Sequence, residues 1–386
     1  MIRTVPFVLA SALLAGCVQP PPPDARAGLA SGQLPPAGLP GRKVAVLVPL
    51  TGSNAGLGRD LLHAIQLALG DDGSQLDIQD TGGTPAGASL AAQAALRAQD
   101  AVIVGPLTAP ETAAAAAVAA GIPILAFTSD RQQGRPGVWA LGITPQQQVA
   151  RLVQTMAQRG HTAVAAVLPA NAFGEALADG VASAAAAVGA PPPQVRRYPN
   201  GRMPALDKAI ADLSDYAHRG ATADPADPAL TPSVPPPFDV LLLGESGPAL
   251  RSVTVSIAKY QAGPPAVQII GPATWARDAA NLSGLAGALY AAPDQATRGA
   301  FEQLYTARFG NTPPGIASIA YDAAQIARVA VNDPAALTSP GGFRGADGPI
   351  VLRTDGQVTR GLAVYAVGPE GPQVVEPVPA SIASGS

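Results

Sequence analysis

The chain has 386 residues, 47% of them hydrophobic, which is enough to bury a sizeable core and to form about two lobes. Its formal net charge is −3, it holds only three lysines, and it shows no basic stripe. These features exclude a typical nucleic-acid-binding surface. Aromatic residues make up only 4% of the chain, too few for a platform that stacks sugars or bases.

The N-terminal segment has the three parts of a secretory signal. Arg3 precedes an apolar stretch, and small residues then lead to Cys17, which is the only cysteine. The run Leu14–Cys17 resembles the bacterial lipobox, in which the cysteine is lipidated and becomes the first mature residue. We therefore expect a signal peptide over 1–16 and a lipid anchor at Cys17. The alternative is a buried free cysteine that follows an apolar run.

Residues 17–41 hold the lipidated cysteine and a proline-rich stretch that cannot bury enough surface to fold, so we expect a semi-extended tether. Short apolar runs of strand length then alternate with helical segments. Strands are expected at 43–49, 76–79, 101–104 and 122–127, and helices at 58–69, 85–98 and 110–120. This alternation is typical of βαβ units and a parallel sheet.

A second α/β unit follows, interrupted by an alanine- and proline-rich segment at 220–237 that we expect to be a surface insertion. Its helices are expected at 145–159, 173–188, 204–219 and 248–261, and its strands at 163–168, 194–198, 240–243 and 267–270. Two further helices are expected at 297–309 and 319–332. Strands at 349–352 and 362–367 would close the fold as a pair around Asp355-Gly356, and 371–386 would be a flexible tail.

Four short motifs, in their order and spacing, resemble type I periplasmic binding proteins of the leucine-, isoleucine- and valine-binding kind. They are Val48–Gly52, Val104–Thr108, Gly121–Ala126 and Tyr321–Ala323. The resemblance covers about residues 42–370 and implies an α/β fold with two lobes, each a mostly parallel sheet flanked by helices. It places lobe 1 at 42–142 plus about 289–335, and lobe 2 at about 143–288 plus 336–370.

Two branches of this family compete. Ala140–Gln148 and the segments Gly342–Gly348 and Leu352–Gly356 are similar to the penicillin-binding protein activators, which resemble the C-terminal domain of LpoA-type lipoproteins. This branch implies a non-enzymatic periplasmic lipoprotein that is anchored to the membrane through its lipid and regulates a peptidoglycan synthase. Val18 after the cysteine favours the outer membrane over the inner one. The alternative branch implies a substrate-binding protein that delivers an amino acid to an ABC permease.

The loops at the carboxyl ends of the strands are the expected ligand cleft, because open α/β sheets bind ligands there. Asp130 could pair with an ammonium group, and Glu245 is placed to face the cleft, although both also suit solvated turns. In amino-acid binders the corresponding loops hold the α-carboxylate and the α-amine, but Glu111 would repel a carboxylate here. The candidate residues are Gly105, Thr108, Thr128, Ser129, Asp130, Phe173 and Glu245.

Signals for catalysis are poor. Gly244–Gly247 begins like a nucleophile elbow, but Pro248 stands where the last glycine belongs. The three histidines are far apart and lack the spacing of a metal site or a catalytic triad. We therefore expect no enzyme activity, no cofactor and no metal.

Overall fold

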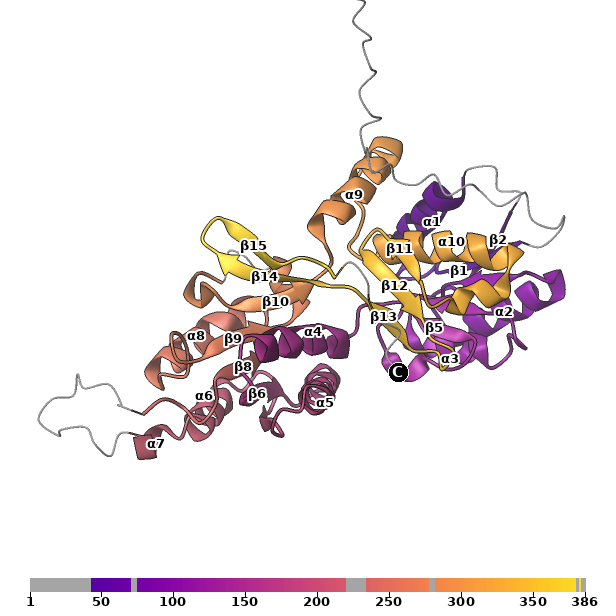
Figure 1. The fold of residues 1–386 in the computed structure, drawn as a ribbon. Coiled ribbons are helices and arrows are strands. Elements are labelled where there is room, and N and C mark those ends of the chain that lie inside the picture. Colours follow the sequence, from indigo (N-terminus) through magenta and orange to yellow (C-terminus); the bar gives the residue numbers. More distant parts are fainter. Residues whose placement is uncertain (1–42, 71–74, 220–233, 278–281, 380–381, 383–386) are drawn as a thin grey trace, which may run out of the picture. The chain divides into compact units, whose positions relative to one another are not determined.

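The computed structural model describes residues 43–70, 75–219, 234–277, 282–379 and 382. The first sheet has five parallel strands in the order β2-β1-β3-β4-β5 (Figure 1). They are β1 Val44–Val48, β2 Leu76–Asp80, β3 Val102–Val104, β4 Ile124–Ala126 and β5 Val138–Ala140. Four of them were predicted, whereas β5, only three residues long, was not.

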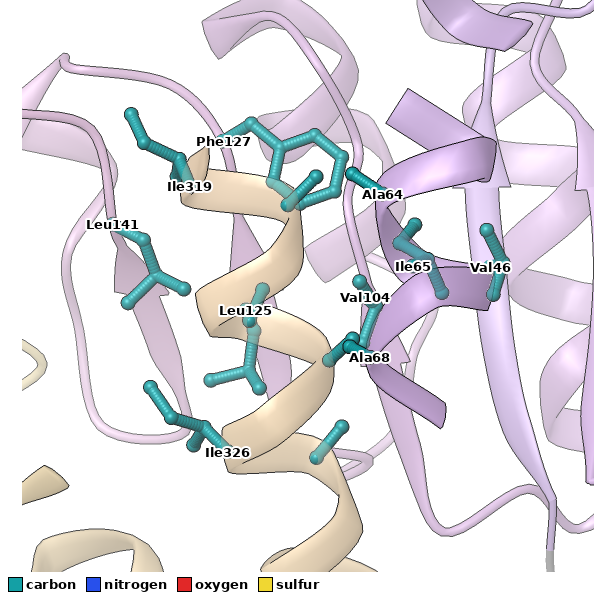
Figure 2. Close-up of a cluster of buried hydrophobic side chains, with 14 of the residues drawn as sticks. Val46, Ala64, Ile65, Ala68, Val104, Leu125, Phe127, Leu141, Ile319 and Ile326 are labelled. Atoms are coloured by element: carbon teal, nitrogen blue, oxygen red, sulfur yellow. The ribbon is translucent and has the colours of Figure 1, made fainter. Parts of the chain in front are cut away.

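Both faces of this sheet are covered by helices. Val44, Val46 and Val48 of β1 pack with α1 (Ala55–Leu69) and α10 (Ala317–Asn332), and Figure 2 shows this cluster. Ala45 and Leu47, on the opposite face of the same strand, pack with α2 (Pro85–Ala98) and α3 (Ala109–Ala116). A strand buried on both faces must be apolar at every position, which is why β1 reads as a continuous apolar run.

The second sheet has seven strands in the order β15-β14-β10-β9-β8-β6-β7. Strands β6 to β10 run parallel, whereas β14 and β15 are antiparallel to their neighbours. The strands are β6 Val164–Pro169, β7 Gln194–Tyr198, β8 Val240–Leu243, β9 Gln268–Gly271, β10 Leu289–Ala292, β14 Ala363–Gly368 and β15 Gly371–Glu376.

Helices cover both faces of this sheet as well. One face packs against α4 (Pro145–Gln158) and α5 (Ala172–Ala187). The other packs against α6 (Met203–Leu213) and α8 (Leu250–Lys259), and the short α7 (Tyr216–Arg219) follows α6. Two sheets of mostly parallel strands flanked by helices confirm the predicted fold class. No helix among the described residues is long and apolar enough to cross a bilayer.

The C-terminal part differs from the prediction in two respects. The turn at Asp355-Gly356 joins β12 (Gly348–Leu352) to β13 (Val358–Arg360), and with β11 (Phe343–Gly345) they form a third, antiparallel sheet. The run 362–367 instead pairs with β10 as β14. The expected tail is wrong at its start, because Gly371–Glu376 forms the edge strand β15, in which Val374 and Val375 favour an extended backbone.

The division into lobes also differs from the expected boundaries. Strand β10, expected in lobe 1, pairs with β9 in the second sheet, and the chain returns to the first core only at α9 (Gln295–Phe309). The third sheet, expected in lobe 2, packs Ile350 and Leu352 into the core of the first sheet. The predicted signal peptide, Cys17, the predicted tether and residues 220–233 of the predicted insertion lie outside the described residues.

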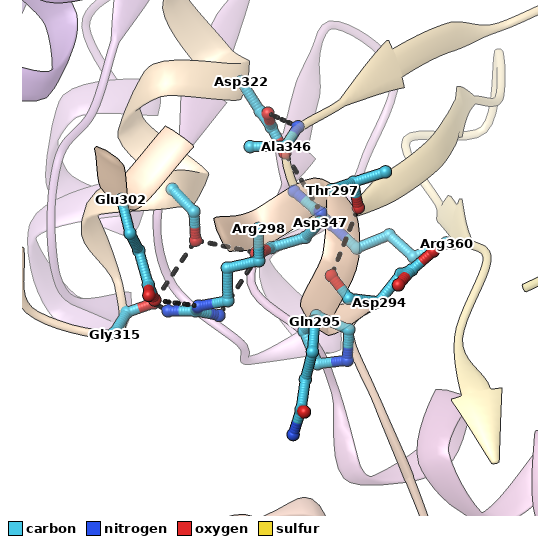
Figure 3. Close-up of polar contacts among 12 residues, drawn as sticks. Asp294, Gln295, Thr297, Arg298, Glu302, Gly315, Asp322, Ala346, Asp347 and Arg360 are labelled. Carbon is cyan, nitrogen blue, oxygen red and sulfur yellow. Dashed lines mark hydrogen bonds and ion pairs between the residues drawn. The ribbon is translucent and has the colours of Figure 1, made fainter. Parts of the chain in front are cut away.

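Two ion pairs link the connecting segments, and one of them reaches α10 (Figure 3). Arg360, at the end of β13, donates from Nε to the Leu141 carbonyl at 2.8 Å and pairs with Asp322 of α10 at 3.4 Å. Arg298 of α9 pairs with Asp347 at 3.2 Å and donates to the Gly315 carbonyl at 2.6 Å. Both carboxylates are almost completely buried, so each needs these partners to offset the loss of water.

Candidate functional site

The loop after β3 uses its polar groups internally. Thr108 caps α3 by accepting from the Glu111 amide, while the Glu111 carboxylate accepts from the Thr108 amide at 3.0 Å and its hydroxyl at 2.7 Å. The second carboxylate oxygen of Glu111 accepts from the Thr81 hydroxyl at 2.6 Å. Glu111 is fully buried. This reciprocal capping box leaves Thr108 without a free donor for the carboxylate of a ligand.

The polar groups of the loop after β4 also form hydrogen bonds within the loop. The Thr128 hydroxyl accepts from the Asp130 amide at 3.1 Å. One Asp130 oxygen accepts from the Gln132 amide and the other from the Gln133 side chain, each at 3.0 Å. Asp130 is thus the cap of the short 3₁₀ helix Arg131–Gln133. Asp130, which we expected to pair with an ammonium group, therefore stabilises a turn instead.

The two candidate residues from the second α/β unit, Phe173 and Glu245, make their contacts within that unit. Phe173, near the start of α5, is partly buried and packs against the core between α4, α5 and the sheet. Glu245, after β8, accepts a short hydrogen bond from the Tyr198 hydroxyl. Burial and this carboxylate raise the pKa of Tyr198, so the phenol keeps its proton. The Glu245 carbonyl also accepts from Trp275 at 2.8 Å.

Gly105 has a structural reason to be glycine. Its φ is +99°, and a Cβ there would overlap the Leu47 carbonyl of the neighbouring strand. The candidate residue therefore lets the loop pass close to β1.

Two adjoining cavities lie beside these loops. The smaller, of about 370 Å³, is lined by Thr128, Ser129 and Ile319, among others. The larger, of about 950 Å³, is lined by residues that include Arg298 and Glu302. Of the candidate residues, the neighbours Thr128 and Ser129 line the smaller cavity, whereas Gly105, Thr108, Asp130, Phe173 and Glu245 line neither.

The sequence reasoning missed Arg277, which lines both cavities. It ends the short 3₁₀ helix Ala273–Arg277, just after β9, and its guanidinium has no hydrogen bond or ion pair with the rest of the described chain. Its place beyond the carboxyl end of a predicted strand was the signal that could have found it. Within the described ranges, histidines and acids form no group suited to a metal ion.

The sequence model of the periplasmic binding protein family matches residues 42–372, so the chain belongs to that family. This confirms the family predicted from the four motifs. The search of curated proteins gave no match.

Solved structures with the same fold come from both branches. A putative branched-chain amino acid ABC transporter protein from Rhodospirillum rubrum aligns with a TM-score of 0.69 at 18% identity, over 86% of this chain and 100% of that one. The LpoA C-domain from Haemophilus influenzae, a regulator of PBP1A, aligns with a TM-score of 0.64 at 16% identity, over 86% of this chain and 99% of that one. The leucine-binding protein LivK from Thermotoga maritima aligns with a TM-score of 0.55 at 17% identity, over 87% of this chain and 98% of that one. At these identities the likeness shows the fold alone.

Proposed function

We propose that this protein is a non-catalytic periplasmic lipoprotein that regulates a peptidoglycan synthase by docking on it. The observation that carries the proposal is the position of Glu111. Its buried carboxylate takes the amide and hydroxyl of Thr108, which a ligand carboxylate would otherwise use. Binding a second carboxylate there would place two anions together at one helix N-terminus, at a high electrostatic cost.

The other polar candidates support the same proposal. The Asp130 carboxylate accepts from an amide and a side chain within its own turn, and Glu245 is held by Tyr198. A cleft that recognises an amino acid needs free groups that converge on its ammonium and carboxylate. These groups are already paired, so the proposal places the functional event on a protein surface rather than in the cleft.

The proposal is tested by adding the purified protein to a purified peptidoglycan synthase of the same organism. We expect direct binding and a changed rate of glycan polymerisation or peptide cross-linking. Another periplasmic binding protein of that organism, with a known small ligand, serves as the matched control. If the synthase neither binds nor changes its rates, the proposal is wrong.

The proposed location rests on Cys17. We infer that its lipid anchors the protein on the periplasmic side, at the outer membrane. Cys17→Ser should remove lipid labelling and move the protein from the membrane fraction to the released periplasmic fraction. Retention of the variant in the membrane fraction would contradict the anchor.

A second candidate function is favoured by Arg277. A guanidinium that has no partner among the described residues and lines cavities of about 370 and 950 Å³ could hold the carboxylate of a small molecule. The protein would then deliver an organic acid to an ABC permease. In that case a carboxylate ligand should stabilise the protein, and Arg277→Gln should abolish the effect.

A further inference from the structure

A third cavity, of about 420 Å³, shares no lining residue with the two cavities described above. We call it the hairpin groove. Its walls are the start of α4, the side of α5 next to α4, the loop after β4, and the turn between β12 and β13. Residues from both segments that the sequence resemblance singled out, Ala140–Gln148 and Leu352–Gly356, line it.

The groove is held in shape by contacts between distant parts of the chain. Buried Trp139 donates to the Arg353 carbonyl at 2.8 Å, and Gln147 donates from its side chain to the Val358 carbonyl at 2.6 Å. Gly356 has φ +85°, and a Cβ there would overlap the Arg135 backbone. The turn therefore has a fixed position against the loop that carries Arg131.

The charge of the groove favours an anionic occupant. Arg131 donates from Nε to Gln357 at 2.6 Å, and Arg353 donates from Nε to Asp355 at 3.2 Å. The terminal nitrogens of both guanidiniums have no partner in the described part of the chain. Asp355 is the one carboxylate among the lining residues, so two cations face one anion.

The wall that α5 contributes to the groove consists of small residues. Gly180, Ser183, Ala184 and Ala187 of α5 line it, and none has a long side chain. This wall therefore presents no long side chain of α5 to a segment whose acidic side chains meet the two arginines. Arginines in such pockets are common anchors of protein interfaces because the planar guanidinium pairs with a carboxylate through two hydrogen bonds.

We propose that the hairpin groove is the docking site for an acidic segment of the protein partner. This inference rests on the proposed function and adds the place of contact and the chemistry of the partner's segment. The groove anchors the segment, and the surrounding surface supplies the rest of the interface, because a cavity of this size is too small to account for a stable complex alone.

The test compares variants of the full-length protein for binding to the purified peptidoglycan synthase. Arg131→Gln combined with Arg353→Gln should weaken binding at least tenfold, since it removes two charge-assisted contacts. Asp355→Asn should strengthen binding, because it removes the opposing charge while the amide oxygen can still accept from the Gln357 backbone. Thermal unfolding of each variant checks that it remains folded.

A matched control makes the same change in net charge at two positions outside the groove. Arg196→Gln with Arg251→Gln also removes two exposed arginines, neither of which forms an ion pair within the described residues. We expect this pair to bind like the unaltered protein. Equal weakening by both pairs would show general charge attraction and overturn the groove assignment.

The remaining outcomes separate this inference from the proposed function. If the synthase binds the unaltered protein and the groove variant equally well, the groove is not the docking site, although the proposed function stands. If the synthase does not bind the unaltered protein at all, both fail. If succinate or phosphate stabilises the protein through Arg131 and Arg353 while synthase binding is unchanged, the groove holds small anions and the inference is wrong.

Discussion

Glu111 holds the loop after β3 together. Its carboxylate accepts three hydrogen bonds, from the Thr81 hydroxyl and from the amide and hydroxyl of Thr108. Glu111→Ala should lower the free energy of unfolding by about 2–4 kcal/mol, because the helix loses its capping box and buried donors lose their acceptor. Glu111→Gln, which keeps an acceptor of similar shape, should cost about 1–2 kcal/mol.

Urea unfolding measures both values, and exposed Glu370→Ala is the control for removing a glutamate. If Glu111→Ala costs no more than Glu370→Ala, the loop does not depend on the internal carboxylate.

Asp100 makes stability depend on pH. The residue is 3% exposed and its carboxylate oxygens have no hydrogen-bond partner. Burial raises the pKa of Asp100 to about 7, with a further contribution from Asp77, while Lys43 opposes the shift. Between pH 4 and pH 7 the unfolded chain therefore binds fewer protons than the folded one, so stability falls as pH rises.

Asp100→Asn should remove this loss, because the amide cannot ionise. We expect the variant to be more stable than the unaltered protein by roughly 1–3 kcal/mol at pH 8, with a much smaller difference at pH 4. Thermal unfolding across this pH range measures the effect. A difference that is constant with pH would contradict the titration of Asp100.

At the scale of elements, the turn between β12 and β13 depends on Gly356. Alanine there would have a positive φ and would also overlap the Arg135 backbone. Gly356→Ala should therefore destabilise by more than the roughly 1 kcal/mol cost of the backbone conformation alone. Gly137 is the matched control, since it has a similar φ of +84° but open space around its Cβ position.

Differential scanning calorimetry of the two glycine variants separates clash from backbone strain. Equal losses of stability for Gly356→Ala and Gly137→Ala would show that the close approach to Arg135 is unimportant.

Most helices and strands were predictable because local signals agree with the tertiary contacts. Helices α2 and α4 begin at Pro85 and Pro145, each after a capping threonine, as the sequence indicates. The partners of β12 and β14 were not predictable, because pairing across sheets depends on contacts between residues that are distant in the chain. Strand β5 was missed because three residues between two turns show no alternation.

At the scale of the whole molecule, the family and the two α/β units follow from motif order and from the alternation of strands and helices. The candidate site was less predictable. The rule for strand ends pointed to Thr128 and Ser129, which line one cavity, but it could not show that Glu111 occupies the capping groups of the loop after β3. Side-chain partners such as Tyr198 for Glu245 come from separate strands and leave no pattern in the sequence.

The measurement that most directly tests the central claim is a thermal-shift screen of the protein against the α-amino acids and small carboxylic acids. A ligand at 100 times its Kd would add about 2.7 kcal/mol of stability. We expect no shift with any α-amino acid, because Glu111 takes the Thr108 donors and because Asp130 and Glu245 already have partners within the chain. A clear shift with an amino acid would contradict this account and favour transport. A shift with a carboxylic acid that Arg277→Gln removes would favour the second candidate function instead.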